Sequence, residues 1–275
     1  MEWYVFFAVL FGAACHAGWN AFLKIRLEPI SAIMSALVVL PVIPFVGIPI
    51  APAWPWIVAS VIFHLGYFIG LTEAYRTGDM GQVYPIARGS APLMTAGATA
   101  LLGEALKPGG WIGIAVLAAG VILMSMRGGR GLAELDRRAV GFALFTAVTI
   151  TLYSLVDGYG ARRSGNALGY TLVLFVGDGM MMAAFALIRR GPGVAYDMAR
   201  HWLSGFVGGT LSLVSYGIAI WAMTVAPIAI VAALRETSVL FGALIAVVIL
   251  KEPLRPIRIA AALLIVSGLA LIRLQ

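Results

Sequence analysis

Two stretches of this 275-residue chain carry the same pattern, 148 positions apart. In each copy an alanine, a polar turn and an apolar run lead to a Glu-x-Leu turn, and a glycine follows in the last apolar run. The matched positions are Ala74 with Ala222, Glu104 with Glu252, Leu106 with Leu254, and Gly120 with Gly268. Each copy spans three hydrophobic segments and follows two more, which makes five segments in each half. Because an odd number of spans turns the second copy over in a bilayer, the repeat predicts two inverted halves, an arrangement typical of alternating-access transporters.

The composition indicates that these segments are membrane spans. The chain is 61% hydrophobic and 11% charged, with a mean hydropathy of +0.98, whereas soluble domains are about 25% charged. Nearly every segment between polar breaks has about 20 apolar residues, enough for a helix to cross roughly 30 Å of hydrocarbon. We therefore predict an all-α membrane protein with ten transmembrane helices in two inverted five-helix repeats. The predicted spans are residues 3–23, 29–50, 54–76, 82–102, 109–126, 139–160, 167–188, 202–224, 228–250 and 256–273.

The same reading divides the chain into a first repeat (1–126), a basic linker loop (127–138) and a second repeat (139–275). A net charge of +7 raises the possibility of nucleic-acid binding. However, the basic residues lie mostly between the spans, where lipid headgroups and topology signals account for them. We expect a multi-pass protein of the bacterial inner membrane, in contact with the lipid bilayer and not with nucleic acid, as a monomer or weak homodimer. Thirteen of the 19 Lys and Arg residues follow odd-numbered spans, which predicts that both termini lie outside the cytoplasm.

Signals of enzymatic chemistry are missing from the sequence. The single cysteine, Cys15, allows no internal disulfide and no thiolate metal site. The chain contains no Gly-rich phosphate loop, no His-Glu-x-x-His sequence and no nucleophile motif. We expect neither an enzyme nor a bound cofactor or metal. Active transport would have to use an ion gradient or exchange, because nothing resembles an ATP site.

Several motifs support a family resemblance that extends over essentially the whole chain. The segments AYRTGDMGQVYPIARGSAPL (Ala74–Leu93) and LRETSVL (Leu234–Leu240), with the two Glu-x-Leu turns, resemble the EamA-type transporters of the drug/metabolite transporter superfamily. This resemblance implies a central cavity formed by spans 1–4 and 6–9, with spans 5 and 10 as supports. Relatives move amino acids, nucleotide precursors, sugars and drugs. Eukaryotic relatives are usually drawn with cytoplasmic termini, which conflicts with the charge count, and the orientation stays open.

Charged residues within the predicted spans are the leading candidates for function. A charge at bilayer depth costs about 2.5–3.5 kcal/mol on insertion scales, yet Arg88, Asp178, Arg235 and Glu236 all lie there. Arg88 and Arg235 occupy repeat-equivalent spans, and together they would clamp a carboxylate or phosphonate. The alternative is neutralised pairs, Arg235 with Glu236 or Asp178, and Arg88 with Glu73. Asp178 and Glu236 would serve in proton coupling or in charge balance.

Polar and aromatic side chains also follow helical faces in these spans. His16, Trp19 and Asn20 form one stripe at i, i+3 and i+4, which we expect to face the bundle because lipid cannot satisfy polar groups. The predicted substrate-binding residues are Trp19, Asn20, His64, Tyr67, Tyr84, Arg88, Tyr153, Tyr216 and Arg235. The predicted coupling or charge-balancing residues are His16, Asp178 and Glu236. For His16 and His64, the alternative is a hydrogen bond between helices. Glu104 and Glu252 are expected to cap the helix that follows each of them.

These observations favour a secondary transporter, acting by alternating access as an exporter of amino acids or related small metabolites. Two alternatives stay open: a carrier of anionic organic solutes such as phosphonates, and a passive facilitative pore. A membrane enzyme or scaffold is disfavoured by the polar stripes and by the lack of catalytic motifs.

Overall fold

The computed structural model describes residues 1–23, 28–77, 80–125, 136–248, 251 and 255–274. Within helices, the side chains of residues 20–23, 28–29, 75, 77, 80–85, 125 and 190 also lie outside the description. The described chain is helical, and these ranges contain no strand. The helices are α1 (Trp3–Leu23), α2 (Glu28–Val39), α3 (Ile43–Val46), the short 3₁₀ helix η1 (Ala51–Ala53), α4 (Trp54–Thr77), α5 (Met80–Leu101), α6 (Pro108–Ser125), α7 (Arg137–Arg163), α8 (Ala167–Arg190), α9 (Gly193–Arg200), α10 (Trp202–Val225), α11 (Ile228–Arg235), α12 (Ser238–Val248) and α13 (Pro256–Leu274).

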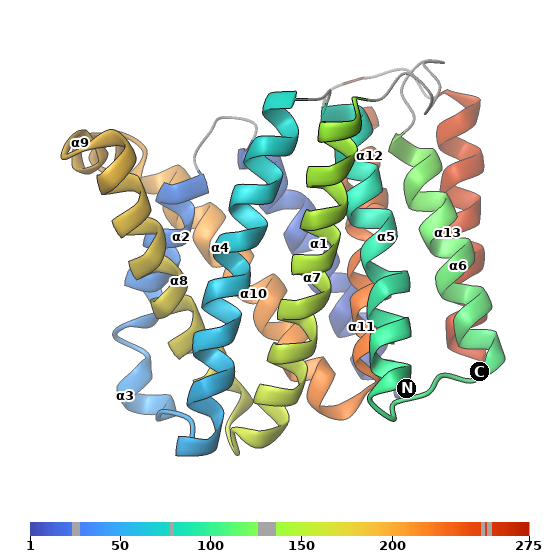
Figure 1. Ribbon diagram of the computed structural model, residues 1–275, viewed down its shortest axis with the longest axis horizontal. Coiled ribbons are helices and arrows are strands. Elements are labelled where there is room, and N and C mark those ends of the chain that lie inside the picture. The colour runs from blue at the N-terminus through green and yellow to red at the C-terminus, as the bar shows by residue number, and fades with distance from the viewer. Residues whose placement is uncertain (24–27, 78–79, 126–135, 249–250, 252–254, 275) are drawn as a thin grey trace.

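Six helices in the described ranges are long and apolar enough to cross a membrane. They cover Ala51–Ala74, Arg137–Arg163, Ala167–Arg189, Trp202–Val225, Ile228–Val248 and Pro256–Leu274. Shorter apolar helices cover Trp3–Trp19, Ile30–Val39 and Pro108–Met124. In Figure 1 the long helices stand side by side, and both termini lie at the same end of the bundle. The prediction of an all-α, multi-pass membrane protein is confirmed.

Many large apolar side chains lie on the outside of the bundle, and a few charged side chains are buried inside it. Phe45 and Leu101 are 89% and 91% exposed, whereas Arg88 is 3% and Asp157 is 0% exposed. A surrounding bilayer explains this distribution, because lipid accepts apolar side chains and charged side chains must find partners inside the bundle. The interior is therefore where polar function is to be sought.

The predicted second span is shorter than expected. The sequence predicted one helix over residues 29–50, but α2 ends at Val39 and the separate one-turn α3 follows. Pro41 lies between them, and proline lacks the N–H that would continue the helix. The 12 residues of α2 cover about 18 Å, less than the roughly 30 Å of a hydrocarbon core.

The predicted ninth span is broken in its middle. α11 ends at Arg235 and α12 starts at Ser238, with a turn at Glu236 and Thr237. The amides of Glu236 and Thr237 bond to the carbonyls of Ala233 and Leu234, three residues back, at 3.0 and 3.1 Å. This is a tight 3₁₀ pattern, which within a longer helix often marks a hinge. The predicted span over residues 228–250 is therefore not one uninterrupted helix.

The helices pack in pairs that connect the two halves of the chain. α1 packs on α10 and α4 on α7, while α5 packs on α7, and α11 and α12 pack on α1. α2 packs on α8, α5 on α11, and α6 on α13. If each predicted span of the first half is exchanged with the equivalent span of the second half, the pair of α1 and α10 becomes the pair of α7 and α4. The other pairs are likewise converted into one another or into themselves, so the set is unchanged. Figure 1 shows α6 and α13 together at one edge, apart from the other long helices.

Small residues bring α6 and α13 into close contact. A β-carbon on Gly113 would lie 2.9 Å from the carbonyl oxygen of Gly268, and one on Gly120 would lie 3.0 Å from that of Ala261. The two backbones therefore approach too closely for larger residues at these positions. Gly113 and Ala261 are 148 positions apart, as are Gly120 and Gly268, so one contact occurs twice with the halves exchanged.

Glu104 does not cap the helix that follows it. Its carboxylate accepts a hydrogen bond from the backbone amide of Ile228, at 3.2 Å, and so caps the first turn of α11. The positive end of a helix dipole stabilises a carboxylate there as it would at α6. Glu252, for which the same role was expected, lies outside the described residues, as does most of the predicted linker 127–138.

Candidate functional site

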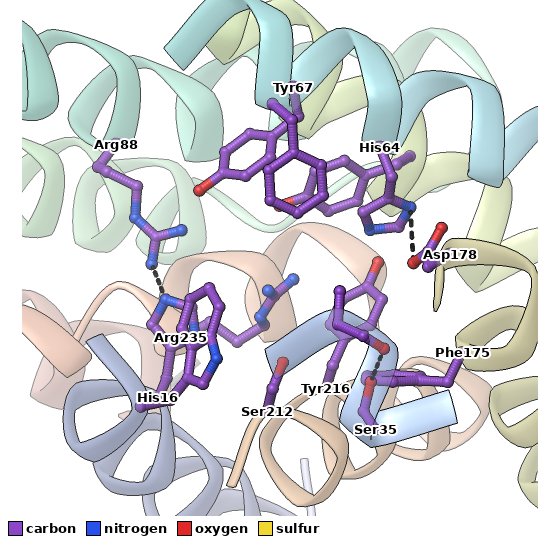
Figure 2. Close-up of a pocket in the computed structure, with 14 residues that line it drawn as sticks. His16, Ser35, His64, Tyr67, Arg88, Phe175, Asp178, Ser212, Tyr216 and Arg235 are labelled. Carbon is purple, nitrogen blue, oxygen red and sulfur yellow. Dashed lines mark hydrogen bonds and ion pairs between the residues drawn. The ribbon is translucent and has the colours of Figure 1, made fainter. Parts of the chain in front are cut away.

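A cavity of about 90 Å³ lies among α1, α2, α4, α5, α7, α8 and α10, beside the break between α11 and α12 (Figure 2). This volume is well above the roughly 10–15 Å³ that a cavity needs to hold one water molecule, so the cavity has room for a small solute. Polar and aromatic side chains dominate its wall. The lining residues are His16, Trp19, Ala32, Ser35, His64, Tyr67, Phe68, Arg88, Tyr153, Phe175, Asp178, Ser212, Tyr216 and Arg235.

Aromatic rings form one connected wall of this cavity. The His64 ring stacks on Tyr153, with centroids 4.3 Å apart and planes at 14°. Tyr67 and Tyr216 both meet Tyr153 edge to face, at 6.1 and 5.9 Å. Such rings present flat apolar faces together with hydroxyl groups at their tips. The wall therefore suits a small solute that carries both apolar and polar groups.

Arg235 supplies a cation at the broken helix. Its Cζ atom lies 4.6 Å from the ring centroid of Tyr216, a cation–π contact. Among the residues that the structure describes, no carboxylate forms an ion pair with Arg235. A guanidinium has five N–H donors in a planar fork, so this side chain keeps the capacity to bind an anionic group.

Arg88, in contrast, is neutralised by its neighbours. Its Nε lies 2.9 Å from Oε2 of Glu236, and both side chains are almost completely buried. Its Nη2 lies 3.2 Å from Nε2 of His16 and 3.5 Å from the Ser238 hydroxyl. The alternative pairs predicted from the sequence were Arg235 with Glu236 or Asp178, and Arg88 with Glu73. In the structure, Glu236 pairs with Arg88 and not with the adjacent Arg235. Glu236 follows Arg88 by 148 positions, so this ion pair joins repeat-equivalent sites.

A carboxylate lies on the side of the cavity opposite Arg235, as Figure 2 shows. Oδ2 of Asp178 is 3.8 Å from Nδ1 of His64. That nitrogen lies 3.0 Å from the backbone carbonyl of Ser60; because a carbonyl only accepts, Nδ1 carries the hydrogen. Oδ1 of Asp178 is buried and has no hydrogen-bond partner among the described residues. Asp178 itself lines the cavity, so its carboxylate group is a candidate partner for a bound cationic group.

A donor without a described partner also borders the cavity. Trp19 is 9% exposed, and its indole Nε1 has no hydrogen-bond partner in the part of the chain that the structure describes. Its ring packs against His16, with centroids 5.4 Å apart. Buried polar groups are normally hydrogen-bonded, so this indole N–H is an exception among the described residues, on a side chain that lines the cavity.

A second buried carboxylate ties the aromatic wall to the helices behind it. Asp157 is 0% exposed and accepts a hydrogen bond from the Tyr170 hydroxyl at 2.9 Å and a short one from the Tyr216 hydroxyl. These contacts connect α7, α8 and α10. The sequence contained a signal for this residue, its i+4 spacing from Tyr153, but Asp157 was not among the predicted site residues.

The structure brings most of the predicted site residues together at this cavity. Those that line it are His16, Trp19, His64, Tyr67, Arg88, Tyr153, Asp178, Tyr216 and Arg235. Glu236 meets the cavity only through Arg88. The side chains of Asn20 and Tyr84 lie outside the described residues. Sequence reasoning missed Ala32, Ser35, Phe68 and Phe175, because alanine and serine are small and common residues and single phenylalanines are unremarkable in a span.

Comparisons with known proteins agree with this architecture. The chain is similar to a protein of solved crystal structure, with 19% sequence identity and a TM-score of 0.78 over 98% of this chain and 95% of the other. At that identity the likeness shows the fold alone. No curated protein matches the chain. The sequence model of the EamA-like transporter family matches residues 137–274, half of the chain. The protein therefore belongs to the EamA-like transporter family of the drug/metabolite transporter superfamily, whose members are multi-pass membrane transporters of small molecules.

Proposed function

We propose that this protein is a secondary transporter that moves amino acids or related small zwitterionic metabolites by alternating access. One observation supports the proposal: the same cavity is lined by Arg235, which has no ion-pair partner among the described residues, and by the carboxylate residue Asp178. A zwitterion carries one charge of each sign and would satisfy both groups at once.

The alternating-access mechanism rests on the proposed pseudo-symmetry of the chain. We take residues 1–126 and 139–275 as two inverted repeats, with ten transmembrane helices in all. Helix pairs that are unchanged when the halves are exchanged, and the doubled contact between α6 and α13, support this arrangement. Broken helices beside a cavity are typical of such carriers, and the break at Glu236 and Thr237 lies next to the lining residue Arg235.

In this proposal, each part of the solute binds a different group of the cavity wall. The carboxylate binds the Arg235 guanidinium, and the ammonium binds Asp178 beside His64. The rings of Tyr67, Tyr153 and Tyr216 contact the solute's apolar part, with the Trp19 N–H as a further donor. Glu236 balances the charge of Arg88, and His16 accepts a hydrogen bond from the Arg88 guanidinium. On the basis of the sequence, Asn20 and Tyr84 remain proposed contacts of the solute. Export as the transport direction and the bacterial inner membrane as the location also remain proposals.

An anionic solute such as a phosphonate would be bound best by two unpaired arginines. The ion pair between Arg88 and Glu236 leaves one guanidinium for this purpose, which favours a zwitterion over a multiply charged anion. A passive pore differs from a carrier in that it cannot accumulate its solute against a gradient.

The test is transport by purified protein in liposomes. Labelled amino acids, phosphonates and sugars are each offered, first in exchange for the same unlabelled solute and then with an imposed proton gradient. We expect counterflow for one or more amino acids, with accumulation above equilibrium when the gradient is imposed. Binding is measured in parallel by thermal shift, since a ligand stabilises the folded state by mass action. Equilibration without counterflow would show that the protein is a pore. Transport of phosphonates alone would overturn the proposal that the substrate is a zwitterion.

A further inference from the structure

Two side chains hold three segments together at the end of the bundle that carries both chain termini (Figure 1). Arg162, at the last turn of α7, donates from Nε to the carbonyl of Met223 at 2.7 Å and from Nη2 to that of Ala226 at 3.0 Å. The same Nη2 lies 3.1 Å from Oε1 of Glu104, in the turn after α5. The end of α7, the α5–α6 turn and the α10–α11 connection thus meet at one guanidinium.

The carboxylate of Glu104 extends this contact to the start of α11. Its Oε1 accepts the amide hydrogen of Ile228 at 3.2 Å. At the other end of α11, Glu236 pairs with Arg88 of α5. α11 is therefore fastened at its start by the turn that follows α5 and at its end by α5 itself. Every residue from Ile228 to Leu234 is buried, so this short helix fills the space that it occupies.

These contacts lie between the cavity and that end of the molecule. Tyr153 lines the cavity, and α7 continues from it toward the end that holds the termini. Asp157, with its two tyrosine hydroxyls, lies about 6 Å further along α7, and Arg162 about 13 Å further, at 1.5 Å of rise per residue. Two sets of polar contacts between helices, one at Asp157 and one at Arg162, therefore follow the cavity along α7 toward this end.

We propose that Arg162 and Glu104 form the latch of the gate on the side of the chain termini, with α11 as the gate segment that the latch holds shut. The inference rests on the proposed alternating-access function. When the latch releases, α11 pivots at the 3₁₀ turn of Glu236 and Thr237, and the cavity opens toward the termini. No chemical step is involved, because only the ion pair and the hydrogen bonds at the latch are exchanged for water.

Access of a thiol reagent to the cavity from each side tests the latch. The single native cysteine is removed by Cys15→Ala, and a probe is placed on the cavity wall by Ser212→Cys. Vesicles of opposite sidedness are treated with a membrane-impermeant maleimide, and protease access to a C-terminal tag identifies the side of the termini. The latch variants are Glu104→Gln, which keeps an oxygen for the Ile228 amide, and Arg162→Gln. The matched control is Arg273→Gln, which removes a charge that stacks on Trp3 at 3.9 Å.

We expect either latch variant to raise labelling from the side of the termini about fivefold, the shift that about 1 kcal/mol produces in a two-state equilibrium. Labelling from the opposite side should fall, and Arg273→Gln should change neither rate. Unchanged labelling in the latch variants, or an equal rise in the control, would overturn the proposal. If Arg162→Gln does not fold, Glu104→Gln decides alone. Labelling requires no substrate, so a failure of the latch is distinguishable from a failure of the transport proposal, which is read by counterflow.

Discussion

The two arginines at the cavity occupy repeat-related spans but have opposite surroundings. Arg88 is 3% exposed and is held by Glu236, His16 and Ser238. Arg235 lies over the ring of Tyr216 and has no ion-pair partner among the described residues. One guanidinium is thus part of the architecture and the other is available for a ligand. A charged residue within a membrane span indicates function, but its partner decides which function.

The largest effect that would test this difference between Arg88 and Arg235 is expected when the carboxylate partner of Arg88 is removed. Glu236→Ala leaves a buried guanidinium without its carboxylate, which costs about 3–5 kcal/mol when such a pair is broken. We expect a large fall in the melting temperature, measured on purified protein in detergent. The double variant Arg88→Ala, Glu236→Ala should recover part of the loss, because no charge is left unpaired. A melting temperature unchanged in the single variant would show that Arg88 is satisfied without Glu236.

Removing the other arginine should affect transport and leave stability intact. Arg235→Ala deletes charge-assisted hydrogen bonds to the substrate, each worth about 1.5–3 kcal/mol. We therefore expect affinity to fall by about tenfold to a hundredfold, with little change in the melting temperature. Arg235→Lys keeps the charge without the planar fork, so its affinity should lie between those of the native protein and Arg235→Ala. Competition binding measures both variants, and full affinity in Arg235→Ala would remove this residue from the proposed site.

The carboxylate across the cavity should be selective for the cationic part of the solute. Asp178→Asn keeps the shape and removes the charge, so we expect amino-acid affinity to fall by about tenfold, the equivalent of one charged hydrogen bond. A des-amino analogue that retains the carboxylate should bind the variant and the native protein equally. The measurement is the ratio of the two affinities. An equal loss for both solutes would assign Asp178 to structure.

The smallest effect is expected at the unpartnered indole of the cavity. Trp19→Phe removes the N–H and keeps an aromatic ring, and a neutral hydrogen bond contributes about 0.5–1.5 kcal/mol. We expect affinity to fall by a few-fold without loss of stability. Trp3→Phe is the control, since Trp3 is 58% exposed on the outside of the bundle. Equal affinity in the two variants would mean that the indole N–H does not contact the solute.

The sequence alone was sufficient for the class of protein and for most of the helices. Runs of about 20 apolar residues require backbone hydrogen bonds within each segment, so helices are the only local solution in lipid. The first span was predicted as residues 3–23, and α1 covers Trp3–Leu23. The predicted helix bounds were wrong where a residue interrupts the backbone hydrogen bonds, as at Pro41, where α2 ends earlier than the apolar run. The ten-helix count and the inverted repeat remain predictions.

Partner choice and the break in the ninth span were decided by tertiary structure. Nothing near Glu236 in sequence shows that it pairs with Arg88 and not with the adjacent Arg235, because that pairing depends on the packing of α5 against α11. The capping of α11 by Glu104 likewise joins residues 124 positions apart. Helical periodicity states which face of a span is polar, since it depends on neighbours along one helix. Which groups meet across that face depends on the other helices, so it is only in the folded molecule that Arg88 gains a carboxylate partner while Arg235 has none among the described residues.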